Sequence, residues 1–153
     1  MPAQVSVQAI LDMAIQLEER GREFCATASE LVGHPGAKEL LRELAEDEVA
    51  HADLFRRVQE RGDYEALARG PVPEDLRLGD TLVETDLGPA STPQDILITA
   101  IRMEQAAIDL YSAWLALYRG TDLETVLEGL VNEERRHKAR LEALYHDVFL
   151  EDW

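Results

Sequence analysis

Apolar side chains recur along this chain at intervals of three and four residues in four separate stretches. Such spacing gathers the apolar residues on one face of an α-helix. The pattern predicts helices over about residues 6–32, 37–61, 92–118 and 122–149. No stretch alternates apolar and polar residues as a half-buried strand does, so the predicted fold class is all-α.

Residues that start or stop helices lie between these stretches. Thr92 and Pro93 form a strong start signal, a capping residue followed by proline at the first helical position. The second and third helices are separated by residues 62–91, a connection rich in Gly, Pro and Asp. A connection of this length suits a four-helix bundle in which it crosses from one end to the other. We therefore expect a single domain over residues 1–153 with up-down-down-up topology.

Composition narrows the class of protein. The formal net charge of −16 argues against nucleic acid as a partner and suits a protein that attracts small cations. Cys25 is the only cysteine, which excludes an intramolecular disulfide and any Cys-x-x-Cys site. The first residues lack a basic signal-peptide region, and no apolar run approaches the length of a membrane span. We expect a cytoplasmic protein with no membrane partner.

The second half of the chain repeats the first at an offset of 86 residues without a gap. Most identities fall on the apolar stripes, where any two amphipathic helices share residue types. Three polar pairs also coincide on these stripes, namely Glu18 and Glu104, Glu48 and Glu134, and His51 and His137. A buried ionised carboxylate costs several kcal/mol unless it is paired or bound to metal. Four of them in one core therefore need compensation.

The depth of these residues along the bundle agrees with a shared site. If the hairpins bend near residues 34 and 120, all six side chains lie roughly 24 Å from a bend, at one level. A spacing of three places the Glu and His of each Glu-x-x-His on the same helix face. A single Glu-x-x-His is common on helix surfaces, but two copies at one offset with matching glutamates favour a site. We predict that the six residues converge as metal ligands.

The charges of this layer suggest its cation. Four carboxylates carry −4 and neutral imidazoles add nothing, so two divalent ions would neutralise the site. Oxygen-rich ligation with one histidine per ion suits iron or manganese better than a structural zinc site, which prefers Cys and His. Zinc stays a further alternative.

Four segments of the sequence resemble the rubrerythrin-like branch of the ferritin-like di-iron superfamily, over about residues 10–145. They are AIQLEERGREF (14–24), LAEDEVAHADLF (44–55), AIRMEQAAIDLY (100–111) and NEERRHKARL (132–141). A Glu from each of two helices and Glu-x-x-His from each of the other two is the ligand pattern of that superfamily. The resemblance implies that Glu18 and Glu104 are terminal ligands and that Glu48 and Glu134 bridge the two ions. It also implies that His51 and His137 each bind one ion.

The resemblance also implies an activity. Proteins of this kind oxidise Fe(II) with hydrogen peroxide or dioxygen, so we expect an oxidoreductase in iron handling or peroxide defence. Glu48 and Glu134 would be the catalytic carboxylates because they hold the bridge between the ions. A homodimer is a further expectation from the family.

Two departures from the family bear on turnover. With Cys25 alone the chain has no rubredoxin-like domain, so electrons would come from a separate donor. Ala107 occupies the position of an additional carboxylate that takes part in redox-linked metal movement. The alternatives are a non-catalytic protein that stores or senses metal, an interaction scaffold, and a di-metal oxygenase acting on an organic substrate.

Some neighbouring residues invite a choice between roles. Tyr111 is expected to pack in the core with its hydroxyl satisfied, or else to donate to the site. Cys25 is expected to be a small buried apolar residue rather than a reactive thiol. Asp47 and Glu133 are expected on solvated faces, with a role as spare ligands as the alternative. His146 is expected to be exposed and not a ligand.

Overall fold

The computed structural model describes residues 7–61, 87, 91–121 and 123–150 of the chain. In this part it contains helices and no strand: α1 (Val7–Leu31), α2 (Pro35–Arg61), α3 (Pro93–Leu117) and α4 (Leu123–Phe149). The predicted all-α four-helix bundle is confirmed. None of the described helices is long and apolar enough to cross a membrane.

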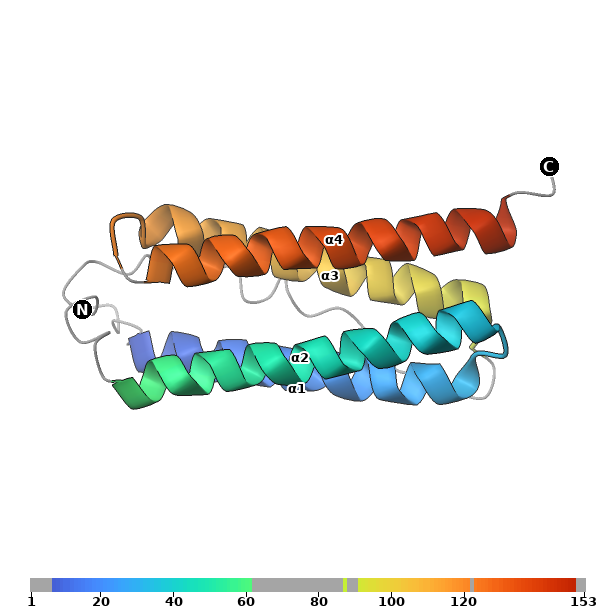
Figure 1. Cartoon of the computed structure of the whole chain (residues 1–153), viewed down its shortest axis with the longest axis horizontal. Coiled ribbons are helices and arrows are strands. Elements are labelled where there is room, and N and C mark those ends of the chain that lie inside the picture. Colours follow the sequence, from blue (N-terminus) through green and yellow to red (C-terminus); the bar gives the residue numbers. More distant parts are fainter. Residues whose placement is uncertain (1–6, 62–86, 88–90, 122, 151–153) are drawn as a thin grey trace, which may run out of the picture.

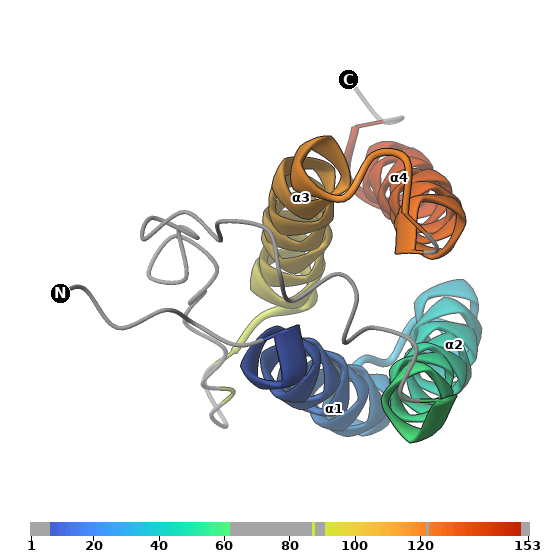
Figure 2. The same cartoon turned by 90° about the vertical axis from the view of Figure 1, so that its left-hand side faces the viewer.

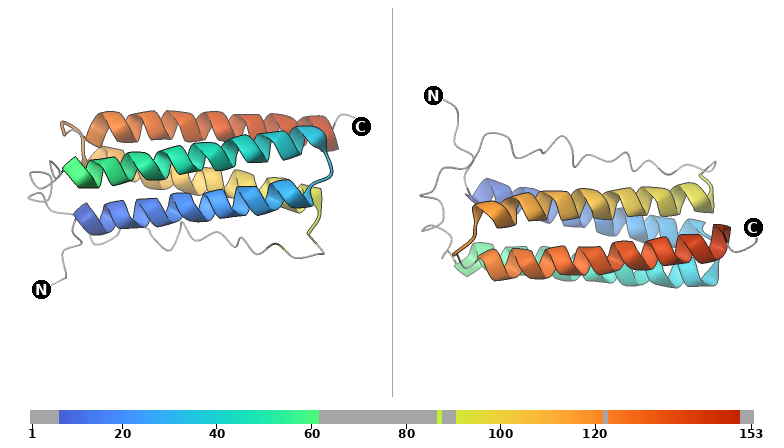
Figure 3. Two further views of the ribbon diagram at one scale, coloured as in Figure 1. Left: turned by 60° about the horizontal axis from the view of Figure 1, so that its bottom comes forward. Right: turned by 90° about the horizontal axis from the view of Figure 1, so that it is seen from above.

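The helices form two antiparallel hairpins, α1 with α2 and α3 with α4 (Figure 1). The end of α2 and the start of α3 lie at opposite ends of the bundle, so α2 and α3 run in the same direction, in the predicted up-down-down-up topology. Seen end-on in Figure 2, α1 lies beside α2 and α3, and α4 lies diagonally opposite α1. Figure 3 shows the two hairpins stacked along their whole length. The predicted crossover lies almost entirely outside the described residues.

The caps of two helices explain where they begin. Thr92 accepts a hydrogen bond from the backbone N–H of Asp95, whose carboxylate accepts from the backbone N–H of Thr92, and Pro93 follows as the first helical residue. α2 begins at Pro35, two residues before the predicted start at 37. The reason is His34, whose Nδ1 accepts a hydrogen bond of 3.2 Å from the backbone N–H of Ala37. His34 therefore does the work of a capping residue.

The core consists of two apolar clusters, one toward each end of the bundle. Fully buried members of the first include Ile10, Phe55, Trp114 and Leu127. Those of the second include Ala28, Leu41, Ile96 and Leu141. In every helix the residues between the two clusters include buried glutamate or histidine. A polar layer therefore crosses the middle of an otherwise apolar core.

Candidate metal centre

The polar layer contains all six of the residues singled out by the repeat. Each is at most 7% exposed, and every helix of the bundle contributes at least one of them. They are Glu18 of α1, Glu48 and His51 of α2, Glu104 of α3, and Glu134 and His137 of α4. The structure thus brings together every predicted ligand.

These side chains form two overlapping groups. Within each group, the candidate ligand atoms all lie within 4.8 Å of one another. The first group contains Glu18 and His51, and the second contains Glu104 and His137. Glu48 and Glu134 belong to both groups. Each group also has a glutamate and a histidine that the other group lacks.

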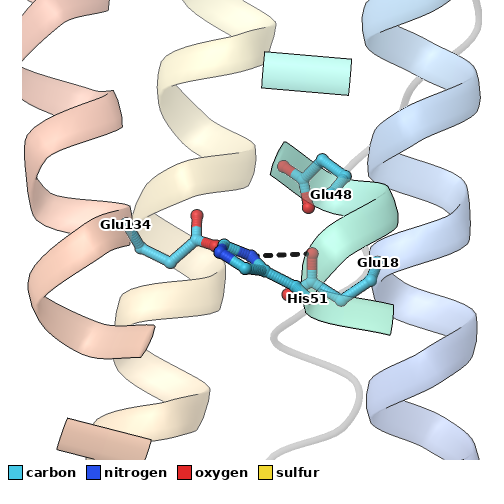
Figure 4. A group of neighbouring side chains, drawn as sticks. All are labelled: Glu18, Glu48, His51 and Glu134. Carbon is cyan, nitrogen blue, oxygen red and sulfur yellow. Dashed lines mark ion pairs between the residues drawn. The ribbon is translucent and has the colours of Figure 1, made fainter. Parts of the chain in front are cut away.

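The histidines face this centre through Nδ1. Nδ1 of His51 lies 3.1 Å from Oε1 of Glu134 and 3.4 Å from Oε2 of Glu18. Figure 4 shows Glu18 and Glu134 approaching the His51 ring from opposite sides. Nδ1 of His137 lies 3.7 Å from Oε2 of Glu134 and 3.7 Å from Oε1 of Glu104. Glu134 therefore contacts both histidines. The two imidazole rings are stacked, with centroids 6.0 Å apart.

Several buried atoms at this centre form no hydrogen bond within the described part of the chain. They are Oε2 of Glu18, Oε2 of Glu104, Oε1 of Glu134, Nδ1 and Nε2 of His51, and Nδ1 of His137. A buried polar atom without a partner costs about 1–3 kcal/mol, more when it is charged. Carboxylate oxygen and imidazole nitrogen are donors for divalent iron and manganese. The donor set therefore fits a pair of divalent cations.

Shifts in pKa describe how the buried residues share protons when no cation is bound. Burial raises the pKa of Glu48 and of Glu104 well above the usual range, and neighbouring glutamates add to this. Burial alone would lower the pKa of both histidines. Hydrogen bonds and charges of the nearby carboxylates outweigh this effect and raise the pKa of His51 to about 11 and that of His137 to about 10. Burial would also raise the pKa of Glu134, yet Glu104 and both histidines hold it well below its usual range. Protons thus occupy places that cations could take.

A second layer of carboxylates contacts the far side of each imidazole. Oδ2 of Asp47 lies 3.0 Å from Nε2 of His137, and Oε2 of Glu133 lies 2.9 Å from Nε2 of His51. Both side chains are partly solvated, at 41% and 35% exposed, and each also contacts a histidine of the centre. Each precedes the glutamate of a Glu-x-x-His, and the two are 86 residues apart. A search for repeated residue types, rather than identical residues, could have found them.

Tyr111 and Cys25, which occupy equivalent positions in the two repeats, are both buried beside the centre. The Tyr111 hydroxyl donates a hydrogen bond of 2.5 Å to Oε1 of Glu18, so the residue is both satisfied in the core and a donor to the site. Cys25 is 4% exposed, and burial, reinforced by Glu104, raises its thiol pKa, in keeping with a small buried residue. The side chain of His146 is 65% exposed, as expected.

Comparison with known proteins agrees with the fold. In the crystal structure of a ferritin-like diiron-carboxylate protein from Thermotoga maritima, the fold superposes with a TM-score of 0.71 and 24% identity, over 95% of this chain and 98% of that one. A dodecameric thioferritin, the bacterioferritin-related protein from Bacteroides fragilis, gives a TM-score of 0.67 and 20% identity, over 97% and 94% of the chains. At these identities the likeness establishes the fold. No curated protein matches the sequence.

A family model adds evidence from the sequence itself. Residues 25–148 match the model of the Ferritin family, described as the ferritin-like domain. The matched region includes five of the six centre residues and leaves out Glu18, which lies before its start. Since the match spans more than half of the chain, this protein belongs to the ferritin-like family.

Proposed function

We propose that this chain binds two iron ions and oxidises Fe(II) with hydrogen peroxide or dioxygen, in iron handling or peroxide defence. The proposed ligands are Glu18, Glu48, His51, Glu104, Glu134 and His137. The observation that carries the proposal is the sharing of Glu48 and Glu134 by two otherwise separate ligand groups. The description of the Thermotoga maritima protein as a diiron-carboxylate protein supports iron over manganese or zinc.

The side chains of this protein would prepare the centre in three ways. Glu48 and Glu134, the proposed catalytic pair, would hold the two positions at a fixed separation, because each reaches both. The hydroxyl of Tyr111 holds one oxygen of Glu18 and leaves Oε2 for a cation. The two apolar clusters on either side keep bulk water from the polar layer. When bound, a pair of ferrous ions supplies two electrons, one from each ion, to a two-electron oxidant.

The rubrerythrin-like branch is our proposal for the closer relationship. Catalytic turnover would require a separate electron donor or replacement of spent iron by fresh Fe(II). Buried Ala107 cannot supply the additional carboxylate of rubrerythrins. We therefore propose slow turnover, with the oxidation of bound iron as the main event. The dodecameric state named for the Bacteroides fragilis protein supports self-association of this chain, for which a homodimer is the simplest form.

The test is anaerobic loading with Fe(II), followed by hydrogen peroxide or air-saturated buffer. We expect close to two Fe(II) bound per chain, and a rise in near-ultraviolet absorbance from ferric iron after the oxidant is added. Glu48→Ala should reduce both bound iron and this absorbance, while exposed Glu46→Ala should change neither. Tight binding of zinc or manganese with no oxidation of iron would contradict the proposal. Two bound irons that stay ferrous would instead indicate a storage or sensing protein.

A further inference from the structure

Gly21 lies in the interior of α1, one turn after Glu18, with Glu48 of α2 directly against it. A Cβ atom at this position would lie 3.1 Å from Cδ of Glu48, and 3.2 Å and 3.3 Å from its carboxylate oxygens. All three distances are shorter than ordinary van der Waals contacts. The Glu48 carboxylate therefore occupies the space that any side chain at position 21 would need.

The backbone gives no other reason for glycine here. Gly120 is the described glycine with a positive φ angle, and Gly21 has ordinary helical geometry. Glycine in a helix interior is less stable than alanine because it loses more backbone entropy on folding. The local preference of α1 would thus favour alanine, and the contact with Glu48 opposes it.

The repeat shows that the two hairpins differ at this position. Ala107 of α3 occupies the position 86 residues after Gly21 and does carry a Cβ atom. It is 8% exposed, so its methyl group fills part of the core. The core therefore accommodates a methyl group at position 107, whereas at position 21 the Glu48 carboxylate occupies that space.

We propose that Gly21 is a positioning residue that allows Glu48 to reach both ligand groups. This inference rests on the proposed function, since it assigns Glu48 to two cations. A methyl group at position 21 would push the Glu48 carboxylate away from α1 by a few tenths of an ångström or turn it aside. Because both groups share Glu48, its displacement would weaken binding of the second cation most, when both positions have to be filled together.

The experiment compares Gly21→Ala with Gly129→Ala in the full chain, using Co(II) without oxidant. Gly129 lies inside α4, and a Cβ atom there would meet nothing within 4 Å. Both substitutions gain helix propensity, so Gly129→Ala should raise the melting temperature of the metal-free protein and leave Co(II) binding unchanged. For Gly21→Ala we expect at least a tenfold loss of affinity for the second Co(II), an altered visible Co(II) spectrum, and a smaller gain in melting temperature than for Gly129→Ala.

A rescue variant separates positioning from general damage. Glu48→Asp shortens the side chain by one methylene and withdraws the carboxylate from the added methyl group. Adding Gly21→Ala to the Glu48→Asp protein should therefore reduce Co(II) affinity much less than adding it to the wild-type protein. An equal cost in both backgrounds would overturn the inference, even if Gly21→Ala alone folds poorly.

The failure of this inference is distinguishable from the failure of the proposed function. Wild-type protein that binds two Co(II), together with Gly21→Ala that binds both with the same affinity and spectrum, overturns the role of Gly21 alone. Wild-type protein that binds no Co(II) overturns the two-cation centre, and the role of Gly21 with it.

Discussion

The carboxylate of Asp47 on α2 lies 3.0 Å from Nε2 of His137 on α4, so each hairpin orients a histidine of the other. Glu133 on α4 and His51 on α2 form the reciprocal contact. A carboxylate can only accept a hydrogen bond, so Nε2 of His137 carries the hydrogen that faces Asp47, and Nδ1 of His137 is directed to the centre. Asp47 thus determines which nitrogen of His137 faces the centre.

Asp47→Asn should weaken cation binding without removing a ligand. The loss of an outer partner of this kind typically reduces metal affinity by about 10–100-fold, because the imidazole is less basic and less firmly oriented. Calorimetric titration with Co(II) in the absence of oxidant measures the change. Glu46→Gln, on the exposed face one residue earlier, is the matched control and should bind as the wild type does. Equal affinity of the two variants would contradict the orienting role.

Tyr111→Phe should destabilise the metal-free protein by about 1–3 kcal/mol, because it removes a hydrogen bond to a buried carboxylate. Urea unfolding monitored by circular dichroism measures the difference. Tyr118→Phe serves as the control, since the buried Tyr118 hydroxyl has no hydrogen-bond partner within the described residues. Its stability should change little or rise slightly. If both variants lose the same stability, the contact with Glu18 contributes nothing specific.

Glu134→Ala should be the most destabilising change at the centre of the metal-free protein. It removes the carboxylate that contacts both raised-pKa histidines and leaves two buried positive charges with weaker compensation. Breaking a buried charge pair in this way costs about 3–5 kcal/mol. Exposed Glu128→Ala on the same helix should change the free energy of unfolding by less than about 0.5 kcal/mol. A loss for Glu134→Ala no larger than that of the control would contradict the pairing.

The stability of the metal-free protein should fall as pH rises. In the folded state His51 and His137 have pKa values of about 11 and 10, against 6.5 for the ordinary side chain. Their contribution is fully present below about pH 6.5 and is lost as pH rises toward the folded values. The raised pKa values of Glu48 and Glu104 act in the same direction. We expect a lower melting temperature at pH 9 than at pH 6 when a chelator is present.

Cation binding should reverse this dependence, because protons and cations compete for the same atoms. Melting curves with saturating Co(II) from pH 6 to pH 8 should show stabilisation that grows with pH. A metal-free melting temperature that rises between pH 6 and pH 9 would contradict the assigned ionisation states.

Periodicity predicted the four helices, and the repeat of polar residues on the apolar stripes predicted the polar layer. The bounds of α3, Pro93–Leu117, are those of α1, Val7–Leu31, moved by 86 residues, so the repeat in the sequence is also a repeat in the structure. The convergence of the six residues followed from their equal depth in two hairpins. Depth depends on the rise per residue, which is the same in every α-helix.

Contacts between hairpins were harder to predict, for a physical reason. Whether Asp47 reaches His137 depends on how far α2 and α4 are rotated about their own axes, and side-chain spacing within one helix does not fix that rotation. The role of Gly21 was hidden for the same reason, since the sequence shows a small residue but not the carboxylate lying against it. The cap formed by His34 was missed because histidine is not among the usual capping residues.

Tyr111 and Cys25 occupy equivalent positions of the repeat but differ in chemistry, so the two halves of the centre are not equivalent. Both proposed cation positions have the same ligand types, yet Glu18 receives a hydrogen bond from Tyr111, while a thiol lies on the side of Glu104. Two positions with like ligands and unlike surroundings would differ in affinity and in reduction potential. Under metal starvation such a protein would lose its ions in a fixed order and pass through one defined half-loaded form.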